Sequence, residues 1–90
     1  MIGSLALAQS SPAVVPGTIE SVSTADSNIV VRTVAGPRTG RFTPRTLISI
    51  GGMPGEVRDL RPGQSVTLHF ALSRAGNVST ELVRIEVRSL

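Results

Sequence analysis

The sequence predicts an all-β protein built as one small domain. Aliphatic residues, Thr and Ser dominate its 90 residues, and β-branched side chains suit the pleated surface of a sheet. Turn signals rich in Gly, Pro, Asn and Asp separate short apolar runs along the chain. Cysteine and tryptophan are absent and His69 is the only histidine. The stability must therefore come from a compact apolar core.

The first 16 residues differ from the rest of the chain. They carry no charge and contain two prolines. The run ALA at residues 6–8, followed by Gln9, matches the small-x-small pattern before a signal-peptidase cut, although the apolar stretch is short and no basic region precedes it. We interpret residues 1–16 as a disordered tail that retains part of a signal peptide, with a chance likeness as the alternative. The barrel domain is then expected over residues 17–90, in a periplasmic or secreted protein.

Two strands are predicted next, over Gly17–Ser23 and Asn28–Val34. A short polar turn joins them, so they should pair as a β-hairpin. Ile19 and Val22 lie three positions apart, and this odd spacing predicts a bulge or sharp bend in the first strand.

The middle of the chain is richer in turn residues. Residues 35–40 (AGPRTG) are predicted to form a loop because they contain two glycines and a proline. A third strand is expected to begin at residues 41–43, to be interrupted by Pro44, and to continue over residues 45–50. Val57 and Leu60 have the spacing of a single helical or 3₁₀ turn that covers one end of a barrel.

The last third contains the clearest strands. Residues 65–73 (SVTLHFALS) alternate strictly, which predicts a strand with four apolar side chains on its core face: Val66, Leu68, Phe70 and Leu72. A second strand is predicted over residues 78–88, with a bulge at Leu82–Val83 and three inward side chains: Val83, Ile85 and Val87. Five or six short strands with intervening turns predict a small closed barrel, OB-like, with an SH3-like barrel as the alternative.

Several segments resemble a family of uncharacterised bacterial exported small β-barrel domains. They are GTIESV near residue 17, TLISIGGMPGEVRDL in the middle, and DLRPGQSVTLHF followed by a Gly-Asn turn and ELVRIEV. The likeness covers residues 17–88 and rests on turn glycines and inward aliphatic side chains. It therefore implies a fold and an envelope setting, and no chemical activity.

More distantly, the layout resembles the periplasmic copper-carrier barrels, which have the OB fold. Those proteins hold Cu(I) with a histidine, two methionines spaced two apart and a stacked tryptophan. This chain has His69 and Met53 but no Met-x-Met pair and no tryptophan, and soft sulfur ligands are what select Cu(I). The resemblance implies the fold without the copper ligands, so we predict no metal site and no cofactor, with weak metal binding as an alternative.

The most distinctive chemical feature is a stretch of arginines without acids. All nine basic residues are arginine, and residues 27–55 hold four of them and no carboxylate, a local charge of +4 against −1 for the remainder. A local basic patch is plausible on these grounds. The predicted binding residues are Arg32, Arg38, Arg41 and Arg45.

These observations rank the function classes. A single histidine and six scattered carboxylates give no catalytic spacing, and the glycine-rich residues 51–55 lack the Lys-Ser/Thr of a phosphate loop. We therefore predict a protein that is not an enzyme but a binding or structural module for an unknown protein or anionic envelope component. Single-stranded nucleic acid is the main alternative, although Phe42 is the only aromatic residue outside the predicted core. The apolar tail is too short to span a membrane.

Overall fold

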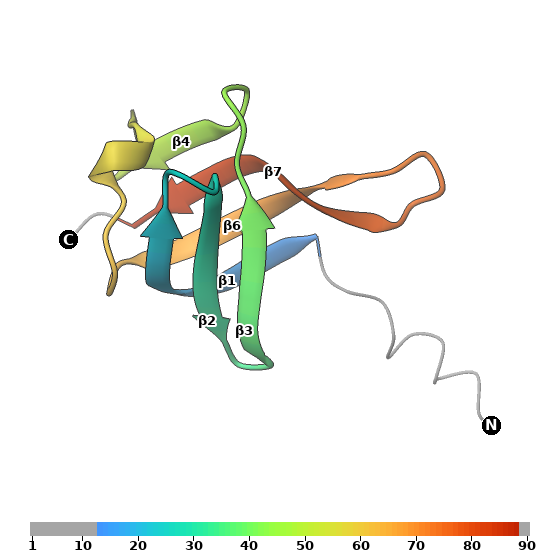
Figure 1. Cartoon of the computed structure of the whole chain (residues 1–90), viewed down its shortest axis with the longest axis horizontal. Helices are drawn as coiled ribbons and strands as arrows, with labels where there is room; N and C mark the ends of the chain where they lie inside the picture. Colours follow the sequence, from blue (N-terminus) through green and yellow to red (C-terminus); the bar gives the residue numbers. More distant parts are fainter. Residues whose placement is uncertain (1–12, 89–90) are drawn as a thin grey trace.

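Residues 13–88, which the computed structural model describes, form one sheet that curls into a closed barrel (Figure 1). The strand order β3-β2-β1-β6-β7-β4-β5, with an additional β3–β7 pairing, closes five strands on themselves and leaves β4 and β5 as an extension beside β7. This confirms the predicted all-β, OB-like barrel. The elements are β1 (Val14–Ser23), β2 (Asn28–Thr33), β3 (Gly36–Arg41), β4 (Leu47–Ile50), β5 (Met53–Pro54), the 3₁₀ turn η1 (Val57–Asp59), β6 (Ser65–Leu72) and β7 (Val78–Val87).

Two predicted bulges are present and bend the strands. The β1–β2 register shifts between Ile19 and Ser21, which leaves Glu20 as the extra residue. The β6–β7 register shifts between His69 and Phe70, where Val83 is the extra residue on β7. Such insertions increase local twist, which a short sheet needs in order to close.

The core lies inside the barrel and contains apolar side chains from four of the five barrel strands, β1, β2, β6 and β7, together with Phe42 directly after β3. Ile48, Ile50 and Val57 pack against it from the β4–η1 side. Leu60 is buried directly after η1, so the predicted turn covers one end of the barrel. The buried residues are Val15, Ile19, Ile29, Val31, Phe42, Leu60, Val66, Leu68, Phe70, Leu82, Ile85 and Val87.

The segment predicted as a loop at residues 35–40 is instead mostly the strand β3. Only Val34 and Ala35 form the turn, where the Thr33 hydroxyl donates to the carbonyl of Gly36 at 2.7 Å. Gly36 has φ 109°, a conformation that glycine adopts without strain. Pro37 is tolerated because β3 pairs with β7 only at Arg41, so the outer edge near Pro37 has no partner strand among residues 13–88.

Other boundaries and faces also differ from the predictions. β1 begins at Val14, three residues before the predicted start, because Val14–Pro16 pair with β6. β3 ends at Arg41 and the next strand begins only at Leu47. The predicted tail and signal-peptide remnant otherwise fall on residues 1–12, outside the described residues.

Two side chains predicted to face the core are exposed. Val83 is 47% exposed and Leu82 only 1%, because the bulge turns Val83 outward and Leu82 inward. Leu72 is 60% exposed, since the far half of the β6–β7 hairpin projects beyond the barrel (Figure 1). Alternation thus identified the strand, but not where along it the core ends.

Candidate functional site

The β2–β3 hairpin carries three of the four predicted binding arginines, and its register separates them onto two faces. Residues directly opposite each other in an antiparallel pair point to the same face. Arg38 is opposite the buried Val31 and therefore points inward. Arg32 and Arg41 are exposed and lie on the outer face, at opposite ends of β2–β3. Arg45 is exposed in the loop after β3, so the four side chains do not converge on one point.

Arg38 is half-buried because it covers an aromatic ring. Its guanidinium carbon lies 4.3 Å from the centroid of Phe70, a cation–π geometry. Both phenylalanines belong to the core, and Phe42 is 8% exposed. The described residues therefore offer no exposed aromatic platform on which a nucleobase could stack.

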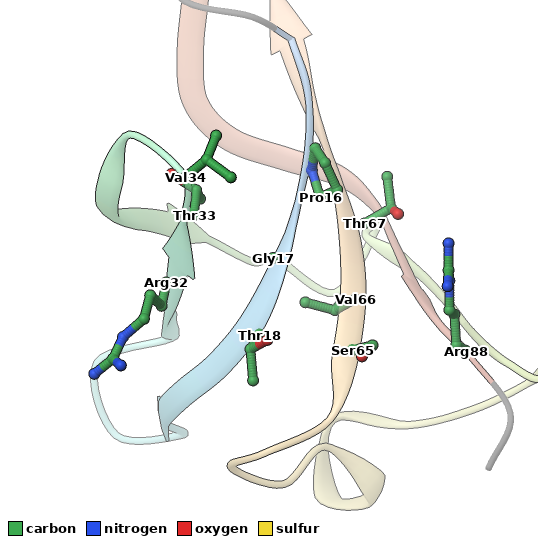
Figure 2. Close-up of a pocket in the computed structure, with 10 residues that line it drawn as sticks. All are labelled: Pro16, Gly17, Thr18, Arg32, Thr33, Val34, Ser65, Val66, Thr67 and Arg88. Carbon is green, nitrogen blue, oxygen red and sulfur yellow. The ribbon is translucent and has the colours of Figure 1, made fainter.

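A groove crosses the outer face of β2, β1, β6 and β7. Thr18 is paired with Arg32 on one side and with Ser65 on the other, and the backbone N–H of Arg88 donates to the carbonyl of Ser65 at 3.0 Å. These four exposed residues thus form one row across the strands, with an arginine at each end. Figure 2 shows Arg32 and Arg88 on opposite sides of this groove, with Thr18, Ser65 and Thr67 between them.

The groove is open and has a volume of about 450 Å³. Pro16, Gly17 and Val34 line its other end, where a small apolar hollow begins beneath the β2–β3 turn. Arg32 also lines an adjoining open pocket beside Thr18 and Glu20. It therefore borders both this pocket and the groove. We refer to the row Arg32, Thr18, Ser65 and Arg88, together with Thr67, as the outer groove.

The two arginines of the outer groove differ in their partners. The Nε of Arg32 donates to Oε2 of Glu20 at 2.7 Å, an exposed ion pair that contributes little to stability. Arg88 has no ion pair with any residue of 13–88. Sequence reasoning missed Arg88 because it lies 33 residues beyond the acid-free stretch that ends at residue 55, and only the pairing of β6 with β7 and β1 brings it to this face.

The two residues considered for metal binding lie apart. His69 on β6 contacts the carboxylate of Glu86 on β7, with 2.7 Å between Nε2 and Oε1. Met53 is exposed on β5, and β7 and β4 lie between it and β6 in the sheet. The three strand spacings between β6 and β5 correspond to about 14 Å between their backbones. Within residues 13–88, no three His, Cys, Asp or Glu side chains gather as a metal site, and His69 and Met53 do not share one site.

Comparison with known proteins supports the fold. No family model and no curated protein sequence matches the chain. Among solved structures, one described as Ag(I)CusF aligns with a TM-score of 0.57 at 16% identity, covering 82% of this chain and 93% of that one. Apo-CusF residues 6–88 from Escherichia coli aligns with a TM-score of 0.56 at 20% identity, over 88% of this chain and 92% of that one. These proteins share the barrel architecture with this chain.

A third similar structure is that of Escherichia coli CusF residues 10–88 with Ag(I). It has a TM-score of 0.57 and 17% identity, and covers 90% of this chain and 96% of that one. The match therefore extends over nearly the whole of each chain.

No helix in the described part of the chain is long and apolar enough to cross a membrane.

Proposed function

We propose that this chain is a non-catalytic, exported binding barrel that holds an anionic partner through its arginine side chains. The observation that carries this proposal is the surface excess of arginine. Eight of the nine arginines are exposed, and Arg38 is half-buried. Only three arginines form ion pairs with carboxylates within residues 13–88: Arg32, Arg58 and Arg84. The remaining exposed guanidiniums keep donors that suit carboxylates, sulfates and phosphates.

The structure changes which arginines are the best candidates. Arg41 and Arg45 are exposed, and Arg32 is exposed although its Nε donates to Glu20, whereas Arg38 is engaged with the ring of Phe70. Replacing Arg38 would therefore confound binding with stability. A periplasmic or secreted location, where acidic proteins and anionic envelope polymers occur, is part of the proposal.

The experiment is a binding measurement on panels of anionic probes at low and moderate salt. The probes are a polyuronate, poly-L-glutamate, anionic lipid vesicles and a thymidine oligonucleotide, with a neutral polysaccharide as the control. We expect at least one anionic probe to bind, with an affinity that falls as salt increases, because exposed charges are screened. Absence of binding to every anionic probe at low salt would reject the proposed function.

Metal binding is the second candidate, because the similar solved structures are described with Ag(I) and Cu(II). In this chain the candidate ligand is His69, with the carboxylate of Glu86 beside it, whereas Met53 lies three strands away. Titration with Ag(I) while following the His69 ring signals by NMR separates the two candidates. A stoichiometric shift of the His69 ring signals, together with loss of Ag(I) binding by His69→Gln in calorimetry, favours metal binding; unchanged ring signals reject the metal candidate.

A further inference from the structure

We propose that the outer groove is a binding site for an acidic oligosaccharide, which it holds by an arginine at each end and a row of hydroxyls between them. This inference rests on the proposed function and assigns it a place and a ligand chemistry. It also adds Arg88, which lies outside the acid-free stretch of the sequence, to the binding residues.

The spacing of the two arginines selects an extended ligand. Arg32 on β2 and Arg88, which directly follows β7, are separated by β1 and β6, which places their backbones about 14 Å apart at ordinary strand spacing. Both side chains are exposed and border the same groove (Figure 2). Two arginines whose backbones are so far apart suit two separate anionic groups on one chain better than a single small anion.

The surface between the arginines suits a ligand with many hydroxyl groups. Thr18, Ser65 and Thr67 line it, and each hydroxyl both donates and accepts hydrogen bonds. The three residues come from adjacent strands β1 and β6, so the row runs across the strands, which are held in place by the barrel. A sugar chain offers alternating donors and acceptors to such a row.

Other polyanions fit this groove less well. A single-stranded nucleic acid needs aromatic platforms for its bases, and the residues lining the groove include none. An acidic peptide would gain from an open strand edge, but β1 and β6 in the groove floor are paired on both sides. The groove presents side-chain hydroxyls and guanidiniums, which are the groups that recognise a hydroxylated, carboxylated chain.

Glu20 acts as a competitor for one of these guanidiniums. Its carboxylate accepts from Nε of Arg32 at 2.7 Å and thus occupies part of the donor set that the ligand would use. Removing its charge should release Arg32 and lower the repulsion of an anionic ligand. A gain of affinity on Glu20→Gln is therefore a specific expectation of this site.

The test compares two double variants with the same change of charge. Arg32→Gln/Arg88→Gln removes both ends of the outer groove, whereas Arg61→Gln/Arg74→Gln removes two exposed arginines that neither line it nor belong to the predicted binding set. Affinity for polygalacturonate is measured by calorimetry at low salt, and NMR spectra confirm that each variant is folded. We expect the groove variant to bind about tenfold more weakly and the control variant to change less than about twofold. Glu20→Gln should bind about twofold to threefold more tightly.

Equal losses in the two double variants would overturn the site, because they would indicate attraction to net charge alone. Binding of poly-L-glutamate or anionic vesicles with no binding of polygalacturonate would overturn the ligand class and leave the proposed function standing. Loss of binding only in the Arg61/Arg74 variant would likewise overturn the groove as the site and leave the proposed function with other arginines. No binding to any of the anionic probes would reject both.

Discussion

The two hairpins that close the barrel, β2–β3 and β6–β7, reach the same architecture from opposite kinds of sequence. β6 has a large apolar residue at every second position, whereas β3 has the composition of a loop, with two glycines, a proline and two arginines in six residues. Yet β3 pairs with β2 along its whole length and contacts β7 at Arg41. The apolar hairpin β6–β7 extends past the core, whereas the polar strand β3 lies against the core.

The comparison teaches that inward positions in a small barrel need not be apolar and large. β3 contributes Gly40 and Arg38 to the inner face, opposite Ile29 and Val31 of β2. The space beside Gly40 is occupied by Leu82 from β7. A large side chain on one strand thus compensates for a missing one on its neighbour, which keeps the interior closely packed.

The largest loss of stability is expected at a buried apolar position of the alternating strand β6. Leu68 on β6 is fully buried in the core. Leu68→Ala should lower the free energy of unfolding by about 2–5 kcal/mol, through lost burial and the cavity left behind. Urea unfolding followed by circular dichroism measures this. A loss below about 1 kcal/mol would contradict the core position assigned to this strand.

A smaller loss in the free energy of unfolding is expected from a substitution at Gly40 on β3. A Cβ on Gly40 would lie 2.7 Å from Cδ1 of Leu82, which is itself buried and has little room to move. Gly40→Ala should therefore destabilise the barrel by about 1–3 kcal/mol. The double variant with Leu82→Val tests the cause, since a smaller side chain at 82 should reduce the penalty of the alanine. Strict additivity of the two changes would reject the contact as its source.

The arginine on the inner face, Arg38, should contribute less to the free energy of unfolding than either core position. Arg38→Gln removes the guanidinium that lies over Phe70 and should cost about 1 kcal/mol. Arg41→Gln, an outward arginine on the same strand, is the matched control and should change stability by less than about 0.5 kcal/mol. Equal effects of the two substitutions would show that the ring contact is not stabilising.

The smallest change in stability is expected at the exposed end of β6. Leu72 continues the pattern of Leu68 but lies on the projecting part of the hairpin. Leu72→Ala should change the free energy of unfolding by no more than about 0.5 kcal/mol. The same urea experiment measures it beside Leu68→Ala, and similar losses for both leucines would mean that the projecting hairpin is packed in solution.

The sequence by itself determined the all-β class, most of the strands and both bulges. Period-two alternation and odd apolar spacing report these features locally, as at Ile19 and Val22. It also identified the arginine-rich character of the hairpin, because charge can be read directly from composition. It did not identify β3, since pairing with β2 overrides the turn propensity of its glycines and proline.

Only the tertiary structure decided which arginines share a face and where the core ends. Closure through β3 and β7 turned Arg38 inward, and the β1–β6–β7 pairing brought Arg88 to the same groove as Arg32. The bulge at Val83 exchanged the faces of two neighbouring residues, which no local pattern could place. The physical reason is that a strand's faces acquire an inside and an outside only when distant strands pair.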